Sequence, residues 1–186
     1  MGEWNKKRVI MQRYDLTASI YDMRYLEEQT AKIKAVIESI NIAEESLVLD
    51  LGCGTGLLFD YVAEKAKIVV GLDISGKILF QAEERARKFL NVHLLKADAE
   101  NIPLKEAFFS HVFAITLIQN TPNLFETLNE IKRVAKKNST IVITGLKRKF
   151  QKETFERMLL DAGLHIATSN SEGLKCYVAI CTKIFH

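Results

Sequence analysis

The sequence predicts a doubly wound α/β fold, in which helices cover both faces of a mostly parallel sheet of seven strands. Segments typical of strands and of amphipathic helices alternate almost from one end of the chain to the other, which is the pattern of a parallel sheet. The apolar run at 112–115 shows no alternation with polar residues, as expected for a strand buried on both faces. The polar segment 170–173 separates the last two strand-like segments and predicts an antiparallel hairpin there.

Hydrophobic periodicity predicts the individual elements. Apolar residues recur every three or four positions in the expected helices, and short apolar runs between polar or glycine-rich turns mark the strands. The last helix stops at Gly163, a residue suited to the left-handed position after a helix. The expected strands are 46–51, 67–72, 92–96, 111–118, 139–146, 164–169 and 174–184, and the expected helices are 28–40, 57–65, 76–89, 124–134 and 151–162.

Length and composition limit the class of protein. The 186 residues, of which 48% are hydrophobic and 26% charged, suit a single domain over residues 1–186. No apolar run approaches the ~20 residues that cross a bilayer, and residues 1–12 lack the apolar stretch of a signal peptide. We therefore expect a cytoplasmic protein without membrane insertion. Three cysteines without a CxxC pair argue against a metal site, and a net charge of +3 permits an acidic partner without requiring one.

Three glycines follow the first expected strand. Gly52, Gly54 and Gly56 lie where this strand passes into a helix, and glycine lets a backbone turn tightly and approach a ligand closely. In open α/β sheets, ligands bind at the carboxyl ends of the strands, near the point where the strand order reverses. We therefore expect a ligand at this loop, rather than glycines that serve packing alone.

The residues around the glycines bear on which ligand the loop binds. A dinucleotide-binding loop has its third glycine at the position that Leu57 occupies here. Asp50 precedes the first glycine, where a carboxylate disfavours a pyrophosphate and suits a cationic ligand. Both features argue against NAD or FAD, although an NAD-binding oxidoreductase stays an alternative interpretation.

The segment 48–56, Val-Leu-Asp-Leu-Gly-Cys-Gly-Thr-Gly, resembles the first motif of class I S-adenosylmethionine-dependent methyltransferases of the ubiquinone/menaquinone-biosynthesis type. The resemblance extends over roughly residues 45–145, because the family's later motifs also fall at the ends of the expected strands. It implies a Rossmann-like fold, methyltransferase activity and S-adenosyl-L-methionine as cofactor. The cofactor-binding residues that it implies are Asp50, Gly52, Cys53, Gly54, Gly56, Asp73, Ile74, Asp98, Ala99, Thr116 and Tyr21.

The resemblance gives four of these residues a specific role. It implies that Asp73 accepts hydrogen bonds from the ribose hydroxyls, which suits a carboxylate facing two vicinal donors. It implies that Asp98 contacts the adenine amino group, that the backbone N–H of Ala99 meets the ring, and that Thr116 lines the methionine moiety. Either aspartate alone would be explained as a helix cap; three motifs in the right order favour cofactor binding.

The N-terminal segment 1–40 resembles the helical lid that members of this family fold over the cofactor, ahead of a Rossmann-like core at 45–186. Tyr14, Tyr21 and Tyr25 fall near helical spacing. Packing of these rings against the sheet explains them as well as a lid does.

No residue receives a catalytic role from the sequence. The methyl group of a sulfonium is already activated, so the protein has mainly to align the acceptor and exclude water. Gln119 and Asn120, in a polar loop after the fourth expected strand, are candidates for lining the acceptor pocket. An Asn-Pro-Pro-aromatic motif for nitrogen acceptors is an alternative, but alignment by the strand puts Thr116 at its Asn position, and the aromatic residue is missing.

The class of acceptor rests on two further observations. Lys147, Arg148 and Lys149 follow the fifth expected strand; they suit either a solvated face or an RNA or protein substrate. No long insertion follows the fourth or fifth strand, so an uncovered site would suit a macromolecular acceptor or a small activator protein that completes the pocket. The sequence thus favours an RNA or protein acceptor. A quinone-like small molecule is the alternative, as is a non-catalytic relative of the fold that acts as a binding subunit.

Overall fold

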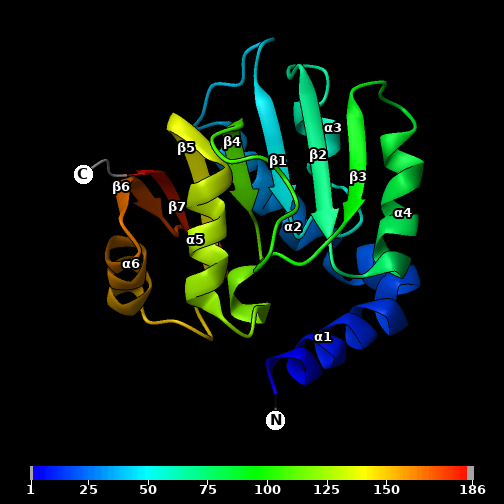
Figure 1. Cartoon of the computed structure of the whole chain (residues 1–186), viewed down its shortest axis with the longest axis horizontal. Helices are drawn as coiled ribbons and strands as arrows, with labels where there is room; N and C mark the ends of the chain where they lie inside the picture. Colours follow the sequence, from blue (N-terminus) through cyan, green and yellow to red (C-terminus); the bar gives the residue numbers. More distant parts are fainter. Residues whose placement is uncertain (1, 184–186) are drawn as a thin grey trace.

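The computed structural model describes residues 2–183, which form one sheet with helices on both faces (Figure 1). The strands are β1 (Leu47–Leu51), β2 (Ile68–Asp73), β3 (Val92–Lys96), β4 (Phe109–Ala114), β5 (Ala135–Leu146), β6 (Leu164–Asn170) and β7 (Cys176–Lys183). The α-helices are α1 (Glu3–Thr17), α2 (Tyr21–Ile37), α3 (Phe59–Val62), α4 (Gly76–Ala86), α5 (Leu124–Val134) and α6 (Lys152–Asp161). Two short 3-10 helices are η1 (Ala18–Ile20) and η2 (Ile118–Asn120).

The strand order is β3-β2-β1-β4-β5-β7-β6, which confirms the predicted doubly wound sheet. The strands β1 to β5 pair in parallel, and the order reverses between β1 and β4. The carboxyl ends of β1, β2, β3 and β4 therefore meet at one edge of the sheet. Strand β7 runs antiparallel between β5 and β6, which confirms the predicted C-terminal hairpin; residue 184, expected to end its second strand, lies outside the described residues.

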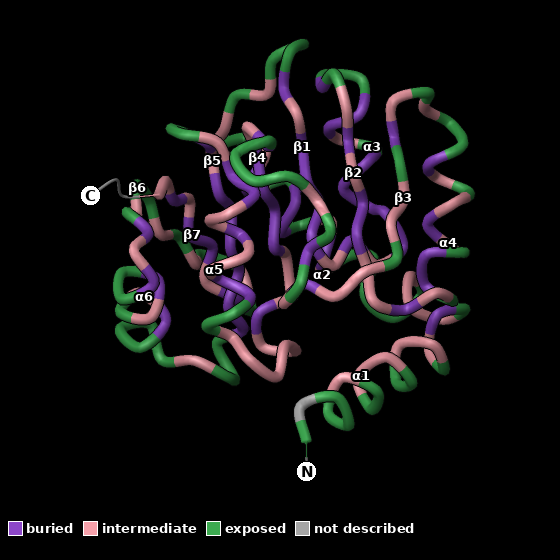
Figure 2. Tube along the Cα trace, viewed as in Figure 1, coloured by how far each residue is buried: buried purple, intermediate pink, exposed green. Residues whose placement is uncertain are grey.

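Two hydrophobic clusters hold the layers together, one on each face of the sheet. Helices α2, α3 and α4 contribute to one cluster, and α5 and α6 to the other. Neighbouring residues of β4 belong to opposite clusters: Phe113 to the first, Val112 and Ala114 to the second, and all three are fully buried. The central strands of the sheet are largely buried (Figure 2). Burial on both faces therefore explains why polar residues do not alternate with apolar ones in β4, as predicted from the sequence.

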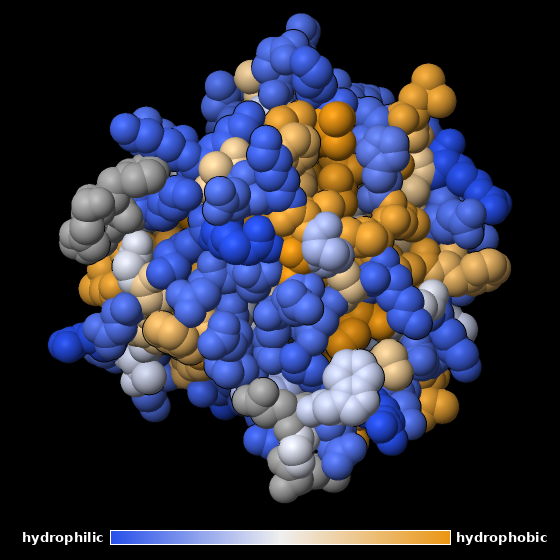
Figure 3. All heavy atoms as spheres, in the orientation of Figure 1, coloured by the Kyte–Doolittle hydropathy of each residue, from blue (hydrophilic) through white to orange (hydrophobic). Residues whose placement is uncertain are grey.

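The sheet face that carries α5 and α6, which faces the viewer in Figure 1, is less completely covered by helices near β3. The segment 97–108 joins β3 to β4 without a helix (Figure 1). Val70, Leu95 and Leu104 are only partly buried against the cluster of this face, and Figure 3 shows apolar side chains at the surface among hydrophilic ones.

Strand β5 starts earlier than the expected residue 139. Its first residue, Ala135, pairs with Phe109, and a β-bulge then shifts the register before His111. Asn138 adopts a left-handed conformation (φ 57°) within this irregular stretch. The bulge lets exposed polar residues lie inside a strand, which is why the polar residues 136–138 gave no strand signal.

Two helices also differ from the expectation. Hydrophobic periodicity indicated no helix before residue 28, but the resemblance implied a helical lid over 1–40, and α1 lies there, along the carboxyl edge of the sheet rather than on a core face (Figure 1). Helix α3 is much shorter than the expected 57–65. Hydrogen-bonded turns flank Phe59–Val62 on both sides, and the amide of Asn91 donates to the carbonyls of Ala63 and Ala66 beyond the helix end. Within residues 2–183, none of the helices has the length and apolar character that crossing a membrane requires.

Gly71, in β2, lies against the buried ring of Phe59. A Cβ at position 71 would lie 2.5 Å from Phe59 Cζ and 3.1 Å from Leu94 Cδ2, and a fully buried ring has little room to move. We expect Gly71→Ala to lower the free energy of unfolding by about 1–3 kcal/mol in urea denaturation. Gly76→Ala is the control, because its Cβ would meet only the flexible end of Lys96 at 3.4 Å. An equal loss in both variants would contradict the packing explanation.

Candidate functional site

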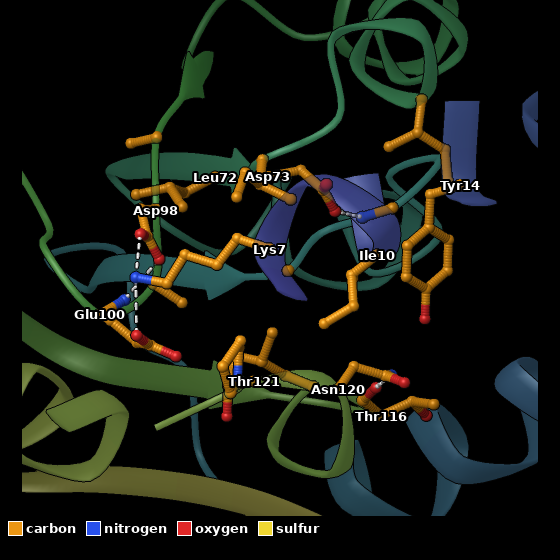
Figure 4. A pocket seen from close by; sticks show the side chains of 18 of the residues that line it. Lys7, Ile10, Tyr14, Leu72, Asp73, Asp98, Glu100, Thr116, Asn120 and Thr121 are labelled. Carbon is orange, nitrogen blue, oxygen red and sulfur yellow. Dashed lines mark hydrogen bonds and ion pairs between the residues drawn. The ribbon is translucent and has the colours of Figure 1, made fainter. Parts of the chain in front are cut away.

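A cleft lies at the carboxyl edge of the sheet, between the glycine loop and helix α1 (Figure 4). Most of the site residues predicted from the sequence line it, although they come from five different segments of the chain. Those on the cleft wall are Tyr21, Gly52, Gly54, Asp73, Ile74, Asp98, Ala99, Thr116 and Asn120. Those that do not line it are Asp50, Cys53, Gly56 and Gln119.

The glycines of the loop serve two different purposes. Gly52, Gly54 and Gly56 have positive φ angles of 74°, 56° and 78°, which glycine adopts without steric cost. A Cβ on Gly54 would meet nothing closer than Tyr21 Cε1 at 3.9 Å, so Gly54 presents bare backbone to the cleft. A Cβ on Gly56 would collide with the ring of Phe59. Gly56 is therefore explained by packing, and Gly54 by close approach of a ligand.

Asp73 connects the loop to the end of β2. Its Oδ2 accepts a hydrogen bond from Gly54 N–H at 3.1 Å, and its Oδ1 accepts one from Ser75 N–H at 2.9 Å. Burial raises the pKa of Asp73, and the backbone N–H donors of Ser75, Gly54 and Ile74 offset only part of this rise. Each carboxylate oxygen accepts about two hydrogen bonds, so Asp73 keeps acceptor capacity for a ligand.

Lys7, on α1, is a cleft residue that the sequence analysis missed. Its Nζ lies 2.6 Å from Asp98 Oδ2 and 2.6 Å from Glu100 Oε2 (Figure 4). Burial lowers the pKa of Lys7, but hydrogen bonds to the two carboxylates outweigh burial and raise it. Lys7, Ile10 and Tyr14 all line the cleft, and their helical spacing is the signal that could have identified this face of α1.

Asp50 lies at the end of β1, only 4% exposed. Burial, and then the nearby charge of Asp73, raises the pKa of Asp50 to about 8. Burial also raises the pKa of the Cys53 thiol well above its ordinary value, which keeps that sulfur unreactive. The sequence placed both residues at the ligand; in the structure they support the loop from inside.

Aromatic rings of α1 and α2 contact one another across the cleft. The ring centroid of Tyr21 lies 6.2 Å from that of Tyr14 and 5.1 Å from that of Tyr25. Tyr14 and Tyr21 line the cleft, whereas Tyr25 is 41% exposed and supports Tyr21 from outside.

Polar contacts hold the two N-terminal helices against the edge of the sheet. Asp22 accepts a hydrogen bond from the Thr55 hydroxyl at 2.6 Å and pairs with Arg85 Nη2 at 2.8 Å. Asp15 accepts a hydrogen bond from the hydroxyl of Ser75, the residue that caps α4. The helices are thus anchored on both sides of the glycine loop.

The segment after β4 forms the remaining wall. Thr116 adopts a left-handed conformation (φ 61°), a genuine outlier for a β-branched residue. Asn120 Nδ2 donates to the Thr116 carbonyl at 2.9 Å, and Asn120 Oδ1 accepts from Arg13 Nη2 at 3.0 Å. The two predicted acceptor-pocket candidates therefore separate: Asn120 lines the cleft, whereas the amide of Gln119 is buried away from it without a hydrogen-bond partner.

The basic segment Lys147, Arg148 and Lys149 is exposed and does not line the cleft. Lys147 Nζ donates to the Ser171 carbonyl at 2.8 Å and lies 5.9 Å from the ring centroid of Tyr177. As to metals, residues 2–183 contain no group of three or more His, Cys, Asp or Glu side chains that could hold an ion.

Comparison with known proteins identifies the family. The chain matches the methyltransferase domain family over residues 49–143, a little more than half of its length. It is 30% identical over 142 residues to a malonyl-(acyl-carrier protein) O-methyltransferase from Marinomonas sp. (strain MWYL1), covering 75% of this chain and 52% of that protein. It is 29% identical over 137 residues to a demethylmenaquinone methyltransferase from Staphylococcus epidermidis, covering 72% of this chain and 55% of the relative. The chain thus spans about half the length of the curated relatives it matches.

Solved structures share the fold. A SAM-dependent methyltransferase from Aquifex aeolicus superposes with a TM-score of 0.72 at 24% identity, over 82% of this chain and 89% of the other. A chain from the complex between the Haloferax volcanii Trm112 methyltransferase activator and a methyltransferase superposes with a TM-score of 0.79 at 16% identity, over 92% and 98%. The resemblance seen in the segment 48–56 is therefore confirmed, and this chain belongs to the methyltransferase domain family, within the class I S-adenosylmethionine-dependent methyltransferases.

Proposed function

We propose that this chain binds S-adenosylmethionine in the cleft and transfers its methyl group to a small, largely apolar acceptor beneath α1. The observation that carries the proposal is the hydrogen bond of 3.1 Å from Gly54 N–H to Asp73 Oδ2. It sets a backbone without a Cβ beside a carboxylate, at the edge where parallel sheets bind ligands. Membership of the methyltransferase domain family supports the same conclusion.

The residues on the cleft wall suit this cofactor. Asp73 has acceptor capacity for two ribose hydroxyls, and Asp98 offers an acceptor for an exocyclic amino group. Asp73 lies close enough to Asp50 to raise the pKa of Asp50, and carboxylates so placed favour a cation. The cofactor would supply a methyl group activated by a sulfonium. Gly54 would leave room for it, and the protein would orient the acceptor and exclude water.

The position of helix α1 favours a small acceptor, and we propose that α1 is the lid of the site. Side chains of α1 line the cleft, so this helix offers a cover although no long insertion follows β4 or β5. Ile10, Tyr14, Tyr21, Leu117 and Pro122 give the cleft an apolar and aromatic wall, as is typical of sites for small molecules. One relative is named for demethylmenaquinone, which agrees with such a wall. The other is named for a malonyl group attached to an acyl-carrier protein.

The macromolecular partners expected from the sequence have less support. Lys147, Arg148 and Lys149 lie outside the cleft, so they carry no argument for RNA or protein as the acceptor. Association with an activator protein rests on likeness to one chain of the Trm112 complex. We treat both as outcomes of the experiment below.

Ligand binding and methyl transfer test the proposed function together. In calorimetry, we expect the protein to bind S-adenosylmethionine and not NAD, since Leu57 and Asp50 depart from the dinucleotide pattern. With labelled cofactor, we expect label in a small-molecule extract rather than in total RNA or protein. Binding of NAD alone would overturn the proposal, and label confined to RNA or protein would overturn the acceptor class. Label that requires an added activator protein would still support the acceptor class.

Asp73 is expected to account for a measurable part of the cofactor affinity. Asp73→Asn keeps the size of the side chain but replaces one acceptor by a donor, so a ribose hydroxyl loses its partner. We expect the affinity for S-adenosylmethionine to fall by about 1–3 kcal/mol in calorimetry. Asp161→Asn, at an exposed position of α6, is the control and should bind normally. Normal binding by the Asp73 variant would show that the ribose assignment is wrong.

Asp50 is expected to link stability to pH. Its pKa of about 8 in the folded protein exceeds the ordinary 3.8, so between these values the folded state holds a proton that the unfolded state has lost. The free energy of unfolding should therefore fall as pH rises through this range, by up to about 1.4 kcal/mol per pH unit. Urea denaturation at several pH values measures the slope, and Asp50→Asn should flatten it. An unchanged slope in that variant would contradict the assignment.

The same proton should couple to the charge of the cofactor. A sulfonium in the cleft favours ionised Asp50, so the affinity for S-adenosylmethionine should rise with pH up to about 8. S-adenosylhomocysteine has a neutral sulfur and is the matched control ligand, with a weaker pH dependence. Parallel pH profiles for the two ligands would contradict this coupling.

A further inference from the structure

A buried lysine lies behind the cleft wall and has no part in the proposed cofactor contacts. Lys32, on α2, is fully buried, and its Nζ lies 2.7 Å from Glu28 Oε1 and 3.2 Å from Thr116 Oγ1. Taking an ammonium out of water is costly even when it is paired, and an apolar side chain often serves a core better. The stability of the core therefore does not explain Lys32.

Besides Glu28, Lys32 contacts Thr116, a strained residue two positions after the end of β4. Thr116 has a φ of 61°, and a β-branched residue keeps such a conformation only where its surroundings impose it. Its N–H donates to Thr144 Oγ1 at 2.7 Å, and its carbonyl accepts from Asn120 Nδ2 at 2.9 Å. Its hydroxyl donates to Gln29 Oε1 at 3.1 Å and accepts from Lys32. Every polar atom of Thr116 is therefore engaged.

Lysine fixes the direction of this network. An ammonium has donors and no acceptor, so the Thr116 hydroxyl accepts from Lys32 and its single proton is left for Gln29. Glu28 balances the buried charge and is only 27% exposed, with Lys175 Nζ at 3.3 Å as a second partner. Lys32 and Gln29 thus hold the Thr116 hydroxyl from outside the cleft, and only one assignment of donor and acceptor is possible.

The network continues through the cleft wall to α1. Thr116 and Asn120 both line the cleft, and Asn120 Oδ1 accepts from Arg13 Nη2 at 3.0 Å. A line of hydrogen bonds therefore runs from Lys32 through Thr116 and Asn120 to Arg13. It connects the two N-terminal helices through the segment where the methyl acceptor would lie.

We propose that Lys32 is a positioning residue: it holds the Thr116 side chain, and thereby fixes the left-handed turn that presents Asn120 to the cleft. The inference rests on the proposed function, because it assigns this turn to the methionine and acceptor end of a cofactor site. Lys32 itself does not line the cleft, so it acts through Thr116.

The variant Lys32→Met separates positioning from support of the core. Replacing a buried charge by an apolar side chain of similar length often leaves stability unchanged or raises it. We expect the urea midpoint to stay the same or rise, while the affinity for S-adenosylmethionine in calorimetry falls about tenfold as the strained turn relaxes. Val36→Ala, at a fully buried apolar position of the same helix, is the matched control: it should lower the midpoint and keep the affinity.

Repeating the Lys32→Met substitution in a Thr116→Gly variant tests whether Lys32 acts through Thr116. Glycine adopts a left-handed conformation without strain, so in the Thr116→Gly background the turn no longer needs Lys32. Thr116→Gly alone loses side-chain contacts and binds more weakly; adding Lys32→Met should then cost less than about twofold. Equal losses in both backgrounds, or no loss in either, would overturn the inference while the wild type still binds. A wild-type protein that binds no S-adenosylmethionine would instead overturn the proposed function, and the inference with it.

Discussion

The glycine loop is attached to the end of β2 by three hydrogen bonds, and the whole cleft depends on this attachment. The N–H groups of Gly52 and Cys53 donate to the Leu72 carbonyl at 2.7 and 3.0 Å, and Gly54 N–H donates to Asp73. Gly52 and Gly54 have positive φ angles where the loop directs these groups toward the neighbouring strand, and glycine adopts such angles without steric cost. The attachment also orients Asp73, which connects the first two strands and faces the cleft.

Much of the fold follows from local pattern, and some of the site follows from topology. The apolar run of β4 was sufficient to predict a buried parallel strand, and the polar turn before β7 was sufficient to predict an antiparallel hairpin. Both signals lie within a few residues of sequence. Asp73 and Asp98 were predicted as site residues from the resemblance to the methyltransferase family, and their positions at the ends of expected parallel strands, which share one edge of a sheet, agreed with it. The structure brings both to the cleft, although their roles toward a cofactor stay predictions.

The parts that the sequence did not yield depend on distant contacts. Lys7 meets Asp98 across 91 positions of sequence, and no local pattern encodes such a pair. Gly56 was assigned to the ligand along with its neighbours, but the ring of Phe59 explains it. The spacing of the glycines indicates that a glycine is required but not why. A ligand and a neighbouring side chain that approach closely both exclude a Cβ atom.

The ion pairs of Lys7 have a consequence for how the site responds to a ligand. A ligand that offers an amino group to Asp98 has to share this carboxylate with the Lys7 ammonium, which is tethered to the same molecule and therefore always present at a high effective concentration. The observed ligand affinity therefore includes the cost of weakening or rearranging the Lys7 ion pair. Because α1 lies outside both hydrophobic clusters, changes in this helix can adjust ligand occupancy while the sheet and the glycine loop stay as they are.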